Sequence, residues 1–304
     1  MVPSGMRLGI DLGGTKMEAV VLDGLNSILA RHRITMPPVY RDALEAIGSL
    51  VAEVERQAGA KVPAIGIGTP GSFSSVSGLL RNAKNTPLDN RPIAADLTDL
   101  LQRQVHIGND ANCFALAEAL LGAGREHDIV FGAIIGTGVG GRLVAYGKPI
   151  LGRNNIGGEW GHNPLQVDGI DPASVPRCNC GRLGCVEAWC SGPGLAADHF
   201  RRTGSEMDTE MLAAFADAGD FEAKETLDLH LVRLGKALAG IVNLLDPDVI
   251  VLGGGLSKMQ HLYTGLPEAM RAHVFSPTFD TPIVQNALGD SAGVIGAAWL
   301  SPNA

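Results

Sequence analysis

Apolar residues alternate with other residues in two stretches, and each stretch breaks at a glycine turn. The segment MRLGIDLGGTKMEAVVLD (6–23) breaks at Gly-Gly-Thr (13–15) and then resumes its alternation. The segment VFGAIIGTGVGGRLVAYG (130–147) has the same form around Gly-Thr-Gly (136–138). Period-two alternation on both sides of a glycine turn predicts a β-hairpin. Two copies of one hairpin predict a duplicated architecture with two similar halves.

Elsewhere, short apolar runs alternate with stretches of helical period. Residues 41–57 carry apolar positions at helical spacing, and AIGIGTPG follows as a short buried strand. QVHIGND is predicted to be another strand that leads into a helix, with Asp110 at the capping position. A long amphipathic helix (227–245), the strand DVIVLGGG and the short helix SAGVIGAAWL complete the pattern. The alternation predicts an α/β fold with sheets covered by helices.

The chain has 304 residues, of which 45% are hydrophobic and 18% charged, enough for two domains with their own cores. We expect an N-terminal domain over 1–124 and a C-terminal domain over 125–291. The boundary is expected near Gly122–Gly124. We expect the C-terminal helix, 292–304, to pack back on the first domain.

Charge and hydropathy exclude several classes of protein. The net charge is −8 with a pI near 5.5 and no basic stripe, so we expect no nucleic-acid partner. The N-terminal residues do not resemble a signal peptide, and no apolar run reaches the roughly 18 residues of a membrane span. We therefore expect a cytoplasmic protein without a membrane partner.

Three of the five cysteines lie close together in CNCGRLGCVE. In a reducing compartment such a cluster is more typical of a metal site or of catalysis than of a disulfide framework. Cys178, Cys180 and Cys185, with His162 upstream, form the Cys₃His ligand set of a closed zinc site. The alternative is three free thiols in a turn. The other two cysteines, in apolar helical context, are expected to be buried without a role.

The glycine turns present backbone N–H groups with no side chain in the way, which suits phosphate oxygens. Asp11 precedes the first turn and would repel phosphate unless a divalent cation lay between them, so it is a candidate for the Mg²⁺ side of the site. The alternative is a tight hairpin that Asp11 caps. Gly253–Gly255 favours the phosphate interpretation.

Two other nucleotide-binding motifs contain glycines of this kind. Residues 136–141 spell G-x-G-x-x-G, and acidic Glu159 follows, as in a dinucleotide-binding oxidoreductase. That fingerprint needs a helix after the glycines, whereas RLVAYG has a strand pattern, so we reject it. No P-loop motif occurs in the chain.

Asp110 is the best candidate for a general base. It lies just past a strand end, beside Asn109, whose amide can hold a hydroxyl. A simple helix-capping role is the alternative, and both roles are compatible. Glu159 and Glu187 flank the cysteine cluster and could accept hydrogen bonds from a polyol, unless they are solvated surface acids.

Taken together, the motifs resemble the ROK family of repressors, sugar kinases and related proteins over nearly the whole chain. The family fold, two ribonuclease H-like domains of the actin/hexokinase type with a cleft between them, agrees with the duplicated hairpin. Because only a few residues precede the first strand, we expect no helix-turn-helix domain of the kind that the family's repressors have, and the resemblance then implies the kinase branch. The segments that carry the resemblance are LGIDLGGTK, IGIGTPG, GNDANCFALAEA, IIGTGVGG, GGEWGHNPL, CNCGRLGCVEAWCSG, LDPDVIVLGGGLS and GDSAGVIGAAW.

The resemblance implies a role for each matched residue. Asp110 would deprotonate a sugar hydroxyl, and structural Zn²⁺ would be bound by His162 and the three cysteines. Other sugar hydroxyls would be held by Asn85, Asn109, Glu159, His162 and Glu187. ATP and Mg²⁺ would be bound through Asp11, Gly13, Gly14, Thr15, Lys16, Thr137, Gly138, Gly254 and Gly255.

GEWGHNPL and NDANC most resemble the fructokinase and mannokinase members. We therefore expect ATP-dependent phosphorylation of D-fructose at the 6-hydroxyl, with mannose or glucose as further substrates. The alternatives are an N-acetylglucosamine kinase or glucokinase of the same family, or a non-catalytic sugar-binding sensor. The resemblance also suggests a homodimer. Arg142 departs from the family pattern, because many relatives have a third glycine there, and Pro87 stands where some relatives have a tryptophan.

Overall fold

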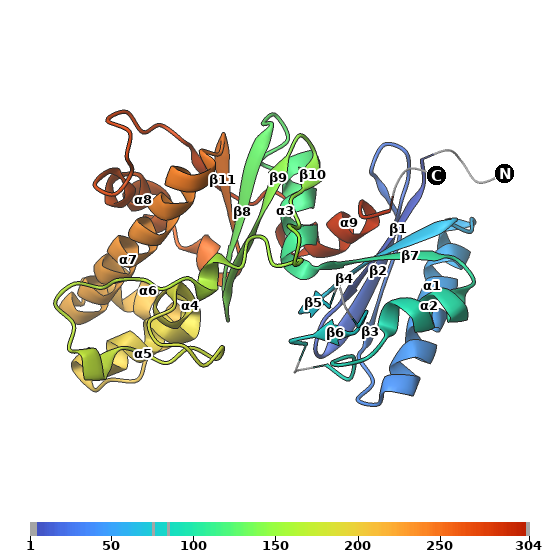
Figure 1. The fold of residues 1–304 in the computed structure, drawn as a ribbon, viewed down its shortest axis with the longest axis horizontal. Coiled ribbons are helices and arrows are strands. Elements are labelled where there is room, and N and C mark those ends of the chain that lie inside the picture. The colour runs from blue at the N-terminus through green and yellow to red at the C-terminus, as the bar shows by residue number, and fades with distance from the viewer. Residues whose placement is uncertain (1–4, 75–76, 84–85, 302–304) are drawn as a thin grey trace. The chain divides into compact units, whose positions relative to one another are not determined.

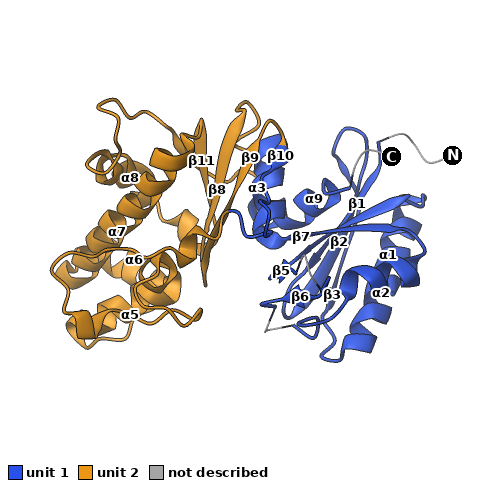
Figure 2. Cartoon of the chain, viewed as in Figure 1, with its two compact units in different colours: residues 1–121, 148–157, 288–304 blue, residues 122–147, 158–287 orange. Residues whose placement is uncertain are grey.

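The computed structural model describes residues 5–74, 77–83 and 86–301 (Figure 1). The chain divides into two compact units: unit 1 comprises 1–121, 148–157 and 288–304, and unit 2 comprises 122–147 and 158–287 (Figure 2). Residues 148–157, which we expected in the C-terminal domain, group with unit 1. None of the described helices is long and apolar enough to cross a membrane.

Unit 1 is built on a five-stranded sheet with the order β3-β2-β1-β4-β7. The first three strands are antiparallel neighbours, and β1, β4 and β7 run parallel. The strands are β1 (Arg7–Leu12), β2 (Lys16–Leu22), β3 (Ile28–Thr35), β4 (Ala64–Thr69) and β7 (Gln104–Asn109), with a small ribbon of β5 (Ser72–Phe73) and β6 (Leu80–Arg81) beside them in sequence. The helices are α1 (Tyr40–Ala58), α2 (Ile93–Leu101), α3 (Asp110–Leu120) and α9 (Ala292–Ala298).

A second five-stranded sheet has the order β10-β9-β8-β11-β12, and all of its strands except the two-residue β10 belong to unit 2. Its strands are β8 (Ile129–Ile135), β9 (Val139–Ala145), β10 (Lys148–Pro149), β11 (Val249–Gly253) and β12 (Ile283–Gln285). The helices are α4 (Val186–Cys190), α5 (Gly192–Thr203), α6 (Thr209–Asp217), α7 (Phe221–Leu245) and α8 (His261–Arg271). Short 3₁₀ turns occupy Trp160–His162, Pro172–Ser174, Gly255–Lys258 and Gly289–Ser291.

The two sheets repeat one arrangement. In each, two parallel strands extend the sheet from the first strand of an antiparallel hairpin: β4 and then β7 follow β1 of the β1–β2 hairpin, and β11 and then β12 follow β8 of the β8–β9 hairpin. The predicted duplication and both predicted hairpins are therefore confirmed. RLVAYG belongs to β9 and its hairpin, not to a helix, as the rejection of the dinucleotide fingerprint required.

Helices pack against the sheet of each unit (Figure 1). In unit 1, the apolar stripe of α1, which includes Ile47, Val51 and Val54, packs into the core with the first strands. On the opposite face, α9 lies against β1 and β4. Glycines line that face because a Cβ at Gly66 would come 1.7 Å from the carbonyl oxygen of Ala297. In unit 2, helices α4 to α8 gather on one side of the sheet around a core of apolar residues.

Candidate functional site

The first glycine turn joins β1 to β2. The N–H of Gly13 donates to the carbonyl of Lys16 at 2.9 Å, which closes the turn. The N–H of Met36 donates to the carbonyl of Thr15 at 3.0 Å and ties the turn to the chain after β3. Gly14, Thr15 and Lys16 are exposed. The turn therefore presents its backbone to solvent, as an anion-binding turn would.

Asp11 lies at the end of β1, opposite Glu18 on β2. Burial, followed by the negative charges of Asp110 and Glu18, raises the pKa of the Asp11 carboxyl to about 6. Arg31 and Arg33 both pair with Glu18, and the positive charge of Arg33 only partly opposes the rise in the pKa of Asp11. A buried carboxylate among other carboxylates gains from a cation, which fits the expected Mg²⁺ side of a phosphate site.

Asn109 caps α3, where the sequence predicted Asp110. The side-chain oxygen of Asn109 accepts from the N–H of Ala111 at 2.9 Å, and its amide nitrogen donates to the carbonyl of Gly71 at 2.9 Å. Asp110 is the first helical residue and is exposed. One of its oxygens also accepts from Ala111 N, at 2.8 Å. Two adjacent side chains thus share one N–H donor, which orients the Asp110 carboxylate at the positive end of the helix.

The second glycine turn lies in unit 2, between β8 and β9. Gly136 N–H donates to the carbonyl of Gly138 at 2.9 Å, while Thr137 is exposed. The Gly254–Gly255 turn lies beside it, because a Cβ at Gly136 would come 3.5 Å from the nitrogen of Gly255. Gly254 has φ +83°, and a Cβ there would come 2.5 Å from the carbonyl of Ile135. Two stretches that the sequence linked to the nucleotide are therefore neighbours.

Glu187 projects from the short helix α4 toward this second turn. Its Oε2 accepts from the N–H of Val139 at 3.1 Å, and its Oε1 lies 3.5 Å from Sγ of Cys178. A Cβ at Gly138 would come 2.8 Å from Oε2. Glu187 is thus the residue that connects the glycine turn with the cysteine cluster.

The four predicted metal ligands come together: their ligand atoms all lie within 4.8 Å of one another. Cys178 Sγ lies 3.6 Å from His162 Nδ1, and Cys180 Sγ lies 3.6 Å from Cys185 Sγ. Zn–S bonds of about 2.3 Å in a tetrahedron separate ligand atoms by roughly 3.5–3.8 Å, so the four residues fit zinc.

The surroundings of two of these thiols shift their pKa values in opposite directions. Hydrogen bonding from the backbone of Arg182, followed by its side chain, lowers the pKa of Cys180 to about 6. Burial instead raises the pKa of Cys178 to about 12. A metal ion would offset that burial cost, because a coordinated thiol is deprotonated.

Glu159 is exposed and directly precedes the 3₁₀ turn that carries His162. This turn is fixed by Trp160, whose Nε1 donates to the carbonyl of Gly140 at 2.7 Å. Arg142, the departure from the family pattern, is 1% exposed. Burial lowers the pKa of its guanidinium, and the charge of Glu159 opposes that change. Arg142 therefore points inward and lies within the electrostatic reach of a candidate sugar ligand.

A buried polar network behind α4 was not predicted from the sequence. Asp198 pairs with Arg233 at 2.6 Å and with Arg201 at 2.9 Å. The guanidinium of Arg233 also lies 4.6 Å from the ring centroid of Trp189. The spacing of Asp198 and Arg201 on one helix was the only local signal, since the other partners are distant in the sequence. The network anchors the helix that carries Glu187.

Asn85 lies outside the described residues. The remaining predicted residues fall into two groups: those in unit 1 are Asp11, Gly13, Gly14, Thr15, Lys16, Asn109 and Asp110, and those in unit 2 are Thr137, Gly138, Glu159, His162, Cys178, Cys180, Cys185, Glu187, Gly254 and Gly255. Unit 1 therefore carries one of the predicted glycine turns and unit 2 carries the other two, and carboxylates lie nearby in each unit.

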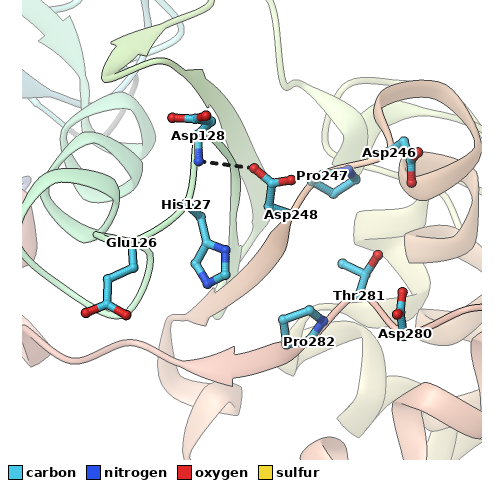
Figure 3. Close-up of a pocket in the computed structure, with 9 residues that line it drawn as sticks. All are labelled: Glu126, His127, Asp128, Asp246, Pro247, Asp248, Asp280, Thr281 and Pro282. Carbon is cyan, nitrogen blue, oxygen red and sulfur yellow. Dashed lines mark hydrogen bonds between the residues drawn. The ribbon is translucent and has the colours of Figure 1, made fainter.

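A separate hollow of about 600 Å³ in unit 2 contains none of the predicted residues (Figure 3). It is lined by Glu126, His127, Asp128, Asp246, Pro247, Asp248, Asp280, Thr281 and Pro282. Asp248 has a structural role there: its Oδ2 accepts hydrogen bonds from the N–H of Asp128 at 3.1 Å and from the N–H of Ile129 at 2.8 Å. These bonds tie the start of β8 to the chain before β11.

Comparison with known proteins gives consistent matches along the chain. The model of the ROK family matches residues 7–304. N-acetyl-D-glucosamine kinase from Escherichia coli O127:H6 is 38% identical over 301 residues, which cover 97% of this chain and 99% of that protein.

Among solved structures, the ROK hexokinase from Thermus thermophilus superposes with a TM-score of 0.88 and 34% identity over 97% of each chain. A ROK family glucokinase from Streptomyces griseus, solved with glucose and AMPPNP, has a TM-score of 0.77 and 28% identity, and the match covers 98% of this chain and 99% of that one. These matches confirm the predicted α/β fold with two actin/hexokinase-type halves.

Proposed function

This chain belongs to the ROK family, and on that premise we propose that it is an ATP-dependent sugar kinase whose preferred substrate is N-acetyl-D-glucosamine. The observation that carries the proposal is the grouping in unit 2 of a glycine turn, Glu187 and the Cys/His cluster, a set that suits phosphate on one side and hydroxyls on the other. The relatives named above support N-acetylglucosamine, our alternative substrate, over D-fructose, which none of them names.

Asp110 would act as the general base. Its carboxylate is exposed and accepts a hydrogen bond from a backbone N–H at the start of α3, which orients it to take a proton from a sugar hydroxyl. The helix end stabilises its charged form. Asn109 would hold the hydroxyl in place with its remaining hydrogen-bonding capacity, and Asn85, Glu159, His162 and Glu187 are proposed for the other hydroxyls.

The two glycine turns would hold the phosphates of ATP through backbone N–H groups. Gly13, Gly14, Thr15 and Lys16 form the first turn, Thr137 and Gly138 belong to the second, and Gly254 and Gly255 are proposed to lie near the adenosine. Mg²⁺, when bound on the side of Asp11, would supply charge neutralisation for the transferred phosphoryl group. Because the net charge of the chain is −8, these local donors must provide the attraction for ATP.

His162, Cys178, Cys180 and Cys185 would hold a structural zinc ion that stabilises the loop before α4. We expect chelation, or Cys180→Ser, to lower the melting temperature and the activity together, because metal binding and folding are coupled. Elemental analysis of the untreated protein gives the zinc content. A fully active protein without zinc would contradict this part of the proposal.

The substrate is tested by ADP release from Mg·ATP with N-acetylglucosamine, glucose, mannose and fructose offered separately. We expect kcat/KM to be highest for N-acetylglucosamine. A preference for fructose would restore the substrate expected from the motifs and leave the kinase mechanism in place. We also propose that the protein is cytoplasmic and forms a homodimer; the mass of the protein in solution tests the homodimer.

A further inference from the structure

Glu187 makes contacts that a sugar ligand does not need. Its Oε2 accepts a hydrogen bond from the backbone of Val139, the residue that ends the second glycine turn. The neighbouring segment adds another bond, because Gly192 N–H donates to the carbonyl of Gly136 at 2.8 Å. The stretch from α4 to the start of α5 therefore holds the turn at both ends. The hydrogen bond from Gly136 to Gly138 closes the turn internally.

These bonds decide which backbone donors the turn can offer. The N–H of Gly136 is used within the turn, and that of Val139 is used by Glu187. Among the described residues, Thr137 and Gly138 are then the ones in this turn whose N–H groups have no protein acceptor. Without Glu187, the Val139 end of the turn would lose a charge-assisted bond, the stronger kind of hydrogen bond.

The helix that carries Glu187 is itself firmly held. Cys185, its N-cap, belongs to the Cys/His cluster. The ring of Trp189 stacks against the guanidinium of Arg233, and the carbonyl of Cys190 accepts from Nε2 of His230 at 3.0 Å. A five-residue helix fixed at both ends is a rigid support for the carboxylate.

We propose that Glu187 is a positioning residue for the nucleotide: it holds the 136–139 turn in its phosphate-binding shape, so that a residue expected to contact the sugar also sets the affinity for nucleotide before any sugar binds. The proposal rests on the proposed sugar kinase function. Its geometric basis is that one carboxylate oxygen faces the turn while the other faces the Cys/His cluster.

The test is the affinity of the full-length, zinc-replete protein for Mg·AMPPNP without sugar, measured by calorimetry. Glu187→Ala removes the acceptor, and we expect it to weaken binding by about tenfold, as loss of one charge-assisted bond would. Glu187→Gln keeps an acceptor oxygen and should stay within about threefold of the unmodified protein. The matched control is Glu206→Ala, which removes an exposed carboxylate that lies outside the proposed site and should leave Mg·AMPPNP affinity unchanged.

Two results would overturn the proposal. Unchanged affinity in Glu187→Ala would make Glu187 a sugar ligand only. Tighter binding in both Glu187 variants would mean that its charge merely repels phosphate. Equal zinc content and cooperative melting in all variants exclude misfolding.

Amide hydrogen exchange over residues 136–140 separates this proposal from the proposed function, because it requires no nucleotide. Glu187→Ala should speed exchange in the turn, and Glu187→Gln should not. If the unmodified protein binds no nucleotide, the kinase function and the effect on affinity both fail. Faster exchange in Glu187→Ala would then still support the positioning of the turn, and unchanged exchange would reject it.

Discussion

Asp110 combines an exposed carboxylate with a fixed orientation at the start of α3. We expect Asp110→Asn to keep the fold and the sugar affinity, because the amide oxygen can still accept from Ala111. The variant should lose kcat by about 10² or more, because the amide cannot take up the proton. Asp208→Asn, the same change at the N-cap of α6, is the control and should leave kcat unchanged. Near-normal turnover of Asp110→Asn would show that Asp110 is not the general base.

The buried imidazole of His230 makes the free energy of unfolding depend on pH. Burial, followed by the charges of His261 and Arg233, lowers the pKa of its imidazole to about 4. The unfolded chain takes up a proton near pH 6.5, so the folded state holds its full stability above that pH and loses stability as the pH falls toward 4. The loss attributable to this one group is on the order of 3 kcal/mol.

Urea unfolding at several pH values between 7.5 and 4 checks this effect. In His230→Gln the free energy of unfolding should fall less steeply with decreasing pH than in the unmodified protein. Parallel curves for the two proteins would mean that the burial of His230 does not contribute to the acid sensitivity.

At the scale of elements, α9 depends on the glycines beneath it. We expect Gly66→Ala to destabilise the protein by about 2 kcal/mol or more, because the new methyl group would collide with the carbonyl of Ala297. Gly240→Ala is the matched control: it lies in α7 with nothing within 4 Å of its Cβ, so it should stabilise by up to about 1 kcal/mol. Thermal unfolding of both variants measures these changes in stability. If Gly66→Ala were as stable as the unmodified protein, α9 would be able to shift away from the new methyl group.

Elements with a strong local pattern could be predicted from the sequence. The hairpins and α1 follow from alternation and helical spacing, and the Cys/His set follows from short spacings. The cap of α3 was misassigned by one residue because Asn109 and Asp110 both carry an oxygen that can cap. Glu187 and Val139 are 48 residues apart in the sequence, and Asp198 and Arg233 are 35 residues apart. A local sequence pattern therefore cannot predict either contact.

At the scale of the whole molecule, one sheet arrangement occurs twice, and each copy offers a glycine turn. Each turn exposes backbone N–H groups of the kind that bind phosphate oxygens, as the proposed ATP-dependent kinase requires. The central claim is therefore that this chain transfers phosphate to a sugar.

The most direct test is ADP release from Mg·ATP by the zinc-replete full chain, measured with and without saturating N-acetylglucosamine. The account predicts that the sugar raises the rate of ADP release by about 10² or more, with one sugar phosphate formed per ADP. An equal rate with and without the sugar would identify a sugar-independent ATPase. No release with any hexose, with sugar binding intact, would identify a sugar-binding sensor and contradict the account.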